Sequence, residues 1–346
     1  MSARKLLAAG SALLVALQLL AGPGGTADRL LRAGEAGLAE AARSHDAPAV
    51  SVAETPLPTV APTAAPVTEP AAAPVSEAAP TTAPDGRAIL PTTISGGLTI
   101  KNETSYTPDV TALLAAGPGL SLSSAGPQVL IIHTHTSEAY TPDSIDRYAA
   151  SGTARTEDTN FNIVRVGDAL TDALTAQGLT VLHDRTIYDY PSYTGSYSRS
   201  GAAVEAALAA NPTIRIVIDL HRDALSNSDV IYKTMAELPD QACAQVMLLV
   251  GTNGSGLEHP DWERHLALAV YLQNAVNAAH PTLMRPIALV NERYNQHLAP
   301  GSILIEVGSS GNTLQEALAA IRLFGEAAAP ALAELTEAPA EVMDEA

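Results

Sequence analysis

The stretch that decides the fold is VLIIHTHTSEAY, residues 129–140. Its first four residues, Val129 to Ile132, form a continuous apolar run, which is typical of a strand buried on both faces of a sheet. The run leads directly into His133, His135 and Glu138. A buried strand that ends in two histidines and a glutamate indicates a metal site, an acid–base site, or a strand end that merely bears histidines.

Apolar strands and amphipathic helices alternate after this stretch. The expected strands comprise residues 129–132, 179–183, 214–220, 246–250, 286–290 and 303–307. The expected helices comprise a segment from Ile163 to a stop at Gly178, a segment through Val204 and Leu208 that ends at Asn211, and residues 261–279 and 313–335. Unbroken apolar strands separated by helices predict an α/β fold, a mainly parallel sheet with helices on both faces.

The rest of the chain divides into segments of different composition. Arg4 and Lys5 precede an uncharged run that reaches Ala27, which predicts a retained membrane anchor, with a cleaved signal peptide as the alternative; in both cases the remaining chain lies outside the cytoplasm. A segment rich in Pro, Ala and Thr follows and is expected to be a disordered tether. The expected organisation is an anchor at 1–27, a tether at 28–95, a globular domain at 96–336 and an acidic tail at 337–346.

Charge and cysteine content limit the partners and the chemistry. The chain has 37 acidic and 19 basic residues and a formal net charge of −18, which disfavours nucleic acid as a partner. The single cysteine, Cys243, excludes an intrachain disulfide and a cysteine-based zinc site, and is expected to be a small buried side chain. A bound metal would therefore need His, Asp or Glu ligands.

Reactive side chains follow several of the expected strands. The strand at 214–220 leads into His221 and Arg222, and Glu306 lies near the end of the strand at 303–307. In a parallel sheet, ligands bind at the carboxyl ends of the strands. We therefore expect these residues to meet His135 and Glu138 at one edge of the sheet.

This set of side chains has the composition of a catalytic zinc site. Catalytic zinc commonly takes two histidines and one glutamate and keeps one position for water, whose pKa the metal lowers. His135, Glu138 and His221 are the candidate ligands, and Glu306 is the candidate general base. The competing interpretation is structural: Glu306 would pair with Arg222 or Arg293, because an unpaired buried carboxylate is costly.

The other histidines and the tyrosine-rich segment give weaker signals. His297 lies in a polar loop before the last strand and could line the cleft, and His183 could border it. His259 and His265 are expected at the surface. Residues 188–197, YDYPSYTGSY, are interpreted as a packed loop in preference to a substrate-binding lip.

Four motifs in this order resemble those of the stage II sporulation protein P family. They are VLIIHTHTSEAY, TNFNIVRVGDAL, IRIVIDLHRDA and RYNQHLAPGSILIEVGSSGNTLQEAL, and the resemblance covers roughly residues 96–335. It implies a membrane-anchored, single-pass N-acetylmuramoyl-L-alanine amidase with a zinc amidase or carboxypeptidase-like catalytic domain outside the cytoplasm. The implied role is peptidoglycan removal during sporulation engulfment, with stage II sporulation proteins D and M as partners.

The resemblance also assigns roles to residues of this chain. It implies Zn²⁺ ligands in the HTH pair and at His221, and a catalytic glutamate at Glu306. The carboxylate ligand is Glu138 in the preferred assignment and Asp158 in the alternative. His133 and His135 are expected to project to the same side of the strand, with His135 as the ligand and His133 as a supporting catalytic residue.

Further expectations concern the substrate and the reaction. Arg222 and His297 are expected to bind the substrate, and the enzyme could also cleave peptide cross-links. Two alternatives remain: a metallopeptidase that cuts only peptide bonds, and a non-catalytic scaffold that binds peptidoglycan.

Overall fold

A seven-stranded sheet with β10 at its centre organises the protein. The structure is a computed structural model that describes residues 81–149 and 154–337. The strand order is β3-β9-β8-β10-β6-β4-β5. The strands are β3 (Ile100–Asn102), β4 (Val129–Ile132), β5 (Val181–His183), β6 (Ile216–Asp223), β8 (Val246–Gly251), β9 (Ile287–Val290) and β10 (Gly301–Ser309).

The sheet is mainly parallel, as predicted. β10 pairs parallel with β6, and β4 lies parallel between β6 and β5. β8 pairs antiparallel with β10, while β9 and β3 continue parallel to β8. The carboxyl ends of β4, β6 and β10 therefore share one edge of the sheet, and those of β8 and β9 point to the opposite edge.

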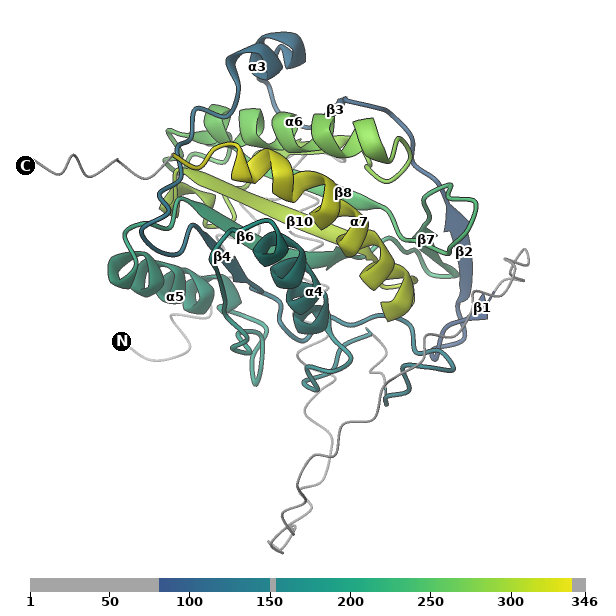
Figure 1. The fold of residues 1–346 in the computed structure, drawn as a ribbon. Coiled ribbons are helices and arrows are strands. Elements are labelled where there is room, and N and C mark those ends of the chain that lie inside the picture. Colours follow the sequence, from purple (N-terminus) through teal and green to yellow (C-terminus); the bar gives the residue numbers. More distant parts are fainter. Residues whose placement is uncertain (1–80, 150–153, 338–346) are drawn as a thin grey trace, which may run out of the picture. The chain divides into compact units, whose positions relative to one another are not determined.

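Helices cover both faces of the sheet, which confirms the predicted α/β architecture. The helices are α3 (Val110–Ala116), α4 (Ile163–Ala176), α5 (Ser196–Ala210), α6 (Trp262–Ala279) and α7 (Leu314–Ala333). Figure 1 shows α4, α7 and α6 side by side in front of the strands. Ile131 and Ile218 pack in the core cluster of these three helices, whereas the alternating Leu130 and Val217 pack with Val204 of α5 on the other face.

Local sequence signals set the ends of two of these helices. Asn162 caps α4, because its side chain accepts a hydrogen bond from the Val164 amide. Thr313 and Glu316 form a reciprocal capping box at the start of α7. Each cap accepts hydrogen bonds from amides that have no partner inside the helix, so α4 begins directly after Asn162 and α7 directly after Thr313.

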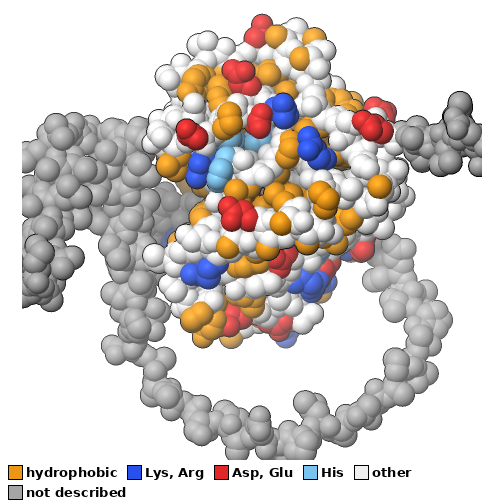
Figure 2. Space-filling model, turned by 90° about the vertical axis from the view of Figure 1, so that its left-hand side faces the viewer, with side chains coloured by type: hydrophobic (Ala, Val, Ile, Leu, Met, Phe, Trp, Pro, Cys, Tyr) orange, Lys and Arg blue, Asp and Glu red, His pale blue; other side chains and the backbone are white. Residues whose placement is uncertain are grey.

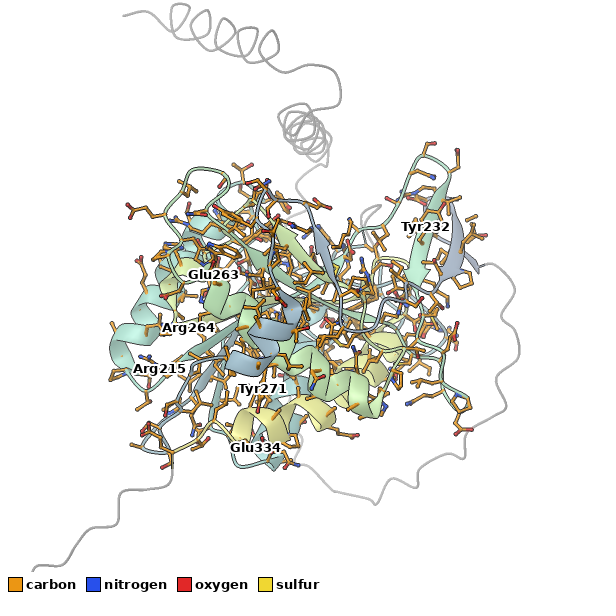
Figure 3. All side chains as sticks on the ribbon, turned by 90° about the horizontal axis from the view of Figure 1, so that it is seen from above. Arg215, Tyr232, Glu263, Arg264, Tyr271 and Glu334 are labelled. Atoms are coloured by element: carbon orange, nitrogen blue, oxygen red, sulfur yellow. The ribbon has the colours of Figure 1, made fainter. Side chains whose placement is uncertain are left out.

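A second, three-stranded sheet lies within the segment expected to be tether. It comprises β1 (Thr81–Thr82), β2 (Ala88–Thr92) and β7 (Val230–Thr234) in the order β1-β2-β7. Ile89 and Ile231 are buried together in it. The prediction that the tether extends to residue 95 is therefore wrong, because residues 88–92 gain a partner strand 142 positions downstream, Ala88 pairing with Val230. Seen from above, Tyr232 of β7 lies apart from Tyr271 and Glu334 at the α6–α7 side (Figure 3).

The N-terminal expectations lie largely outside the described residues. The predicted anchor at 1–27, the tether up to residue 80 and the tail beyond residue 337 belong to this part of the chain. Within residues 81–149 and 154–337, no helix has the length and apolar character needed to cross a membrane.

His259 and His265 are buried, so the prediction that they lie at the surface is wrong. His265 is fully buried in α6, where its Nε2 lies 2.9 Å from the Ala299 carbonyl oxygen. His259 Nε2 lies 2.9 Å from His265 Nδ1. Burial lowers the pKa of His265 to about 4, and burial together with His265 lowers the pKa of His259 to about 3.

This pair predicts a loss of stability in acid. Both histidines stay neutral in the folded state below 6.5, their ordinary pKa, whereas the unfolded chain takes up protons. The contribution is complete above pH 6.5 and falls as the pH decreases toward 4. Between pH 6.5 and pH 5, one such histidine lowers the free energy of unfolding by about 2 kcal/mol. Urea unfolding should therefore show a smaller decrease between pH 7.5 and pH 5 for His259→Gln than for the unmodified protein.

The matched control for this measurement is His280→Asn. His280 is the C-cap of the same helix, α6, and is only partly buried. It should retain the decrease of the unmodified protein. An equal decrease in all three proteins would contradict the assignment of this pH dependence to the His259–His265 pair.

Candidate active site

Strand alternation places three polar residues of β6 on one face of the sheet. Asp219, His221 and Asp223 occupy every second position of the strand IVIDLHRD. Glu306 of β10 is the direct register partner of His221. The register of this ladder shifts between Glu306 and Ser309, where Gly308 has a φ of 64°. The resulting bulge ends regular pairing just beyond Glu306, a device often found beside active sites.

Glu138 and His221 meet at the carboxyl ends of β4 and β6. Glu138 Oε2 lies 3.3 Å from His221 Nδ1 and accepts a hydrogen bond of 3.2 Å from the Arg222 amide. Arg155 approaches the other oxygen, Oε1, at 3.3 Å. Burial would raise the pKa of Glu138, but Arg222, His221 and Arg155 together hold it far below its usual range.

His221 lies between two carboxylates. Its Nε2 is 2.8 Å from Asp219 Oδ1, although the ring N–H is not aligned for a regular hydrogen bond. A proton must nevertheless lie between the two atoms, because two buried lone pairs 2.8 Å apart would repel one another. Burial opposes a charge on His221, but Asp219 and Glu138 raise its pKa well above the ordinary value. The position therefore favours a positive charge.

Aromatic side chains surround His135. Its ring stacks on Tyr193 at 4.4 Å between centroids, meets Tyr197 edge-on at 5.5 Å and lies 5.3 Å from the His221 ring. Nε2 is 3.0 Å from the Tyr193 hydroxyl, and Nδ1 is 3.4 Å from Ser196 Oγ. Burial lowers the pKa of His135 to about 4, so its ring nitrogens are available as lone-pair donors at neutral pH.

The tyrosine-rich segment borders the site, so its interpretation as a packed loop does not describe Tyr193. The Tyr193 side chain is 51% exposed while it stacks on His135. Tyr197 contacts His135 and also Tyr294, whose ring lies 5.7 Å away. This part of the segment therefore covers His135 with a ring that is itself partly exposed to solvent.

Glu306 presents an unpaired oxygen to the site. Its Oε2 is buried without a hydrogen-bond partner among the described residues. Burial, and next the nearby Asp223, raise the pKa of Glu306 to about 8. Asp223 is itself paired with Arg285 at 2.8 Å. Arg293, one proposed structural partner of Glu306, instead donates a hydrogen bond to the Glu258 carbonyl oxygen.

His133 lies on the other side of the strand from His135. The prediction that both histidines project to the same side is wrong, because β4 ends at Ile132 and the chain turns before alternation can continue. His133 Nδ1 is 2.9 Å from the Leu220 carbonyl oxygen, and Nε2 is 2.8 Å from His183 Nε2. Both imidazoles pack under Gly167 of α4. Burial, and then His183, lower the pKa of His133 to about 3.

Of three other expected site residues, Asp158 and His297 lie outside the cluster, whereas Arg222 contacts Glu138. Asp158 is exposed and accepts hydrogen bonds from Asn160, so the structure brings Glu138, not Asp158, to His221. Arg222 is 4% exposed and donates to the carbonyl oxygens of Ala139 and Ala154, which places its guanidinium beneath the site. His297 is half-buried in a short 3-10 helix, Gln296–Leu298. The charged groups nearest to it are Arg293 and Glu205, and not the residues of the cluster.

The candidate ligands converge, but their side chains do not form a closed metal cage. Throughout residues 81–149 and 154–337, no three His, Cys, Asp or Glu side chains are placed as such a cage. Glu138 and His221 face one another, whereas both ring nitrogens of His135 point to hydroxyl groups. Figure 2 shows histidine side chains reaching one face of the protein among interspersed acidic and basic groups.

Sequence reasoning missed several residues that build the site. Asp219, Arg155, Asp189 and Tyr193 all contact it or its supports. The period of two in IVIDLHRD, which places Asp219 on the same face as His221, could have identified the first. Arg155 and Asp189 lie in irregular segments, and no local pattern predicts their contacts.

The fold and the cluster define an α/β protein with a histidine–carboxylate site at the carboxyl edge of its sheet. A family model described as Stage II sporulation protein P matches residues 75–329. The chain belongs to the stage II sporulation protein P family, as the sequence motifs predicted.

Individual relatives are more distant. Stage II sporulation protein P of Bacillus subtilis (strain 168) is 29% identical over 213 residues, which cover 57% of this chain and 50% of the relative. This chain thus aligns with about half the length of that relative. Among solved structures, the N-acetylmuramoyl-L-alanine amidase from Clostridium difficile 630 is 15% identical, with 61% of this chain and 96% of that chain covered and a TM-score of 0.36. The corresponding amidase from Mycobacterium smegmatis is 13% identical, with 62% and 98% covered and a TM-score of 0.35.

Asp189 anchors the tyrosine segment to the first strand end. Its carboxylate accepts hydrogen bonds from the Ser137 amide at 2.9 Å and the Ser137 hydroxyl at 2.6 Å, and pairs with Arg155 at 2.7 Å. The side chain is fully buried. All three contacts hold residues that flank His135 or Glu138.

We expect Asp189→Ala to lower the free energy of unfolding by about 2–4 kcal/mol, because it leaves a buried amide and a guanidinium without this acceptor. Urea denaturation measures the change. The control is Asp158→Ala, an exposed carboxylate whose loss should cost less than about 0.5 kcal/mol. Equal effects of the two substitutions would show that the Asp189 contacts do not stabilise the fold.

Proposed function

We propose that this chain is a zinc-dependent N-acetylmuramoyl-L-alanine amidase that hydrolyses peptidoglycan. The observation that carries the proposal is the convergence of His135, Glu138, His221 and Glu306 at one edge of the sheet. The four residues come from β10, β6 and the end of β4, and they are the residue types of a zinc hydrolase. Membership of the stage II sporulation protein P family supports the choice of peptidoglycan as substrate.

Three distances support His135, Glu138 and His221 as the zinc ligands. Glu138 Oε2 and His221 Nδ1 are 3.3 Å apart, which is roughly the spacing of two ligand atoms on a tetrahedral zinc with bonds of about 2 Å. The His135 and His221 ring centroids are 5.3 Å apart, close to the roughly 5 Å expected for two imidazoles on one zinc. His135 Nε2, 3.0 Å from the Tyr193 hydroxyl, would exchange this contact for the metal.

The chain's own residues account for the proton transfers of amide hydrolysis. A zinc ion at this position would lower the pKa of a bound water and polarise the scissile carbonyl. Glu306 Oε2 is unpaired and faces the same side of the sheet as His221, so it can accept the proton of the attacking water. The raised pKa of Glu306 suits the second transfer, in which the same oxygen returns that proton to the departing amine nitrogen.

The cellular setting of this activity is also a proposal. Segment 1–27, which is uncharged from Leu6 to Ala27, would anchor the chain in the cell membrane by a single pass, with the catalytic domain outside the cytoplasm. A role in sporulation engulfment beside stage II sporulation proteins D and M is part of the same proposal, because the chain belongs to the stage II sporulation protein P family. Cleavage of peptide cross-links would be a second activity of the same site.

Glu306→Gln tests the general base. The substitution keeps the shape of the side chain but removes the group that accepts a proton. We expect peptidoglycan hydrolysis to fall by 10²-fold or more, with the fold and the zinc content unchanged. Mass spectrometry of the products from purified peptidoglycan measures the rate and identifies the bond that is cut.

The same product analysis can contradict the proposal in two ways. If only bonds within the peptides are cut, the protein is a metallopeptidase and not an amidase. Undiminished hydrolysis by Glu306→Gln would exclude Glu306 as the base.

Removal of the metal tests the zinc assignment. We expect the purified chain to contain one zinc, and chelation to abolish hydrolysis until zinc is restored. His221→Ala should lose the zinc, because it removes a ligand between Glu138 and His135. His280→Asn, outside the site, should retain it. A protein that contains no zinc and hydrolyses peptidoglycan equally with and without chelator would overturn the assignment.

A further inference from the structure

Asp219 links both histidines of the site to one buried carboxylate. It stands in the middle of β6 and is 7% exposed. Its Oδ1 accepts a hydrogen bond from the Thr134 amide at 2.8 Å, and its Oδ2 accepts one from the Thr134 hydroxyl at 2.7 Å. The same Oδ1 lies 2.8 Å from Nε2 of His221.

The contacts with Thr134 fix the backbone directly before His135. β4 has already ended at Ile132, so the strand ladder no longer holds this backbone. Two hydrogen bonds from one residue to one carboxylate restrain both its amide and its side chain. The Thr134 hydroxyl also lies 2.7 Å from Ser200 Oγ of α5, which ties the turn to the helix that covers this face.

Asp219 and Glu138 contact opposite edges of the His221 imidazole. Nδ1 faces Glu138 Oε2 and Nε2 faces Asp219 Oδ1, so the two carboxylates contact opposite edges of one imidazole. Histidines that bind metals commonly direct their second nitrogen to a carboxylate, which fixes the ring orientation and leaves the first nitrogen for the metal. His221 has this arrangement, with Nδ1 on the side of the cluster.

We propose that Asp219 is the positioning residue of the metal site: it orients His221 through Nε2 and holds His135 through Thr134. This inference rests on the proposed zinc function. Asp219 contacts His221 directly and reaches His135 only through Thr134, and its side chain is 10% exposed, so it acts through the metal ligands. Its loss should weaken zinc binding more than it weakens the fold.

The test is the zinc affinity of Asp219→Asn, measured by competition with a chromophoric chelator on the full chain. The asparagine side chain has the size of the aspartate side chain, but its NH₂ group cannot accept the hydrogen bond that one of the two carboxylate oxygens accepts. We expect a 10- to 100-fold loss of zinc affinity. Activity should recover at correspondingly higher zinc concentrations, which a purely structural defect would not allow. Hydrogen exchange of the Thr134 amide in the metal-free protein should become at least several-fold faster.

The matched control is Asp223→Asn. Asp223 occupies the same face of the same strand two positions beyond His221, but it pairs with Arg285. Its substitution removes the same charge and should change zinc affinity less than threefold. Equal losses of zinc affinity in the two variants would overturn the inference, because the removal of any negative charge near the site would then explain both.

Two further outcomes separate this inference from the proposed function. Zinc binding by the unmodified chain together with undiminished affinity in Asp219→Asn overturns the inference alone. Absence of zinc from the unmodified chain overturns the zinc assignment and this inference with it. Asp219→Glu, which keeps the charge but displaces the carboxylate by one methylene, replaces Asp219→Asn if that variant does not fold, and the same 10-fold or greater loss is expected.

Discussion

The parallel ladder between β6 and β10 is the constraint on which the rest of the site depends. It aligns His221 with Glu306 in the centre of the sheet and directs both side chains to the face opposite α4, α6 and α7. A slip of one residue would turn these groups into the apolar core and bring Leu220 or Ile305 to the site. Both of those residues are fully buried, so the apolar packing on one face specifies the register that the polar face requires.

Charge compensation explains how so many ionisable groups are buried at this edge. Glu138 is 5% exposed and lies among Arg155, Arg222 and His221, while Asp219 accepts hydrogen bonds from Thr134 and lies against His221. Because Asp219 and Glu138 both lie against the imidazole of His221, they raise its pKa well above the ordinary value. Glu306 stands apart, because burial and Asp223 favour its protonated form. The site thus combines carboxylates whose pKa is held low with one whose pKa is raised.

The surroundings of His135 show how an irregular segment completes a site that begins on strands. The chain between β5 and α5 returns over the end of β4 and brings Tyr193 onto the His135 ring. Asp189 holds the base of this segment through Ser137 and Arg155. Tyr193 is therefore positioned through a buried ion pair at the base of its segment, and its side chain remains partly exposed to solvent.

The sequence by itself determined the fold class, the family and most of the central residues, because these depend on local information. Apolar strands, helix caps and reactive residues at strand ends can be recognised in windows of about ten residues. Only the tertiary structure decided which side chains meet. It placed Glu138 beside His221, left Asp158 exposed, kept His133 beneath α4 while the turn carried His135 to the other face, and built β2 and β7 into a second sheet. It also revealed Asp219, Arg155 and Asp189, since their partners are between 2 and 85 residues distant and are joined by the parallel register and by turns whose conformation no local periodicity specifies.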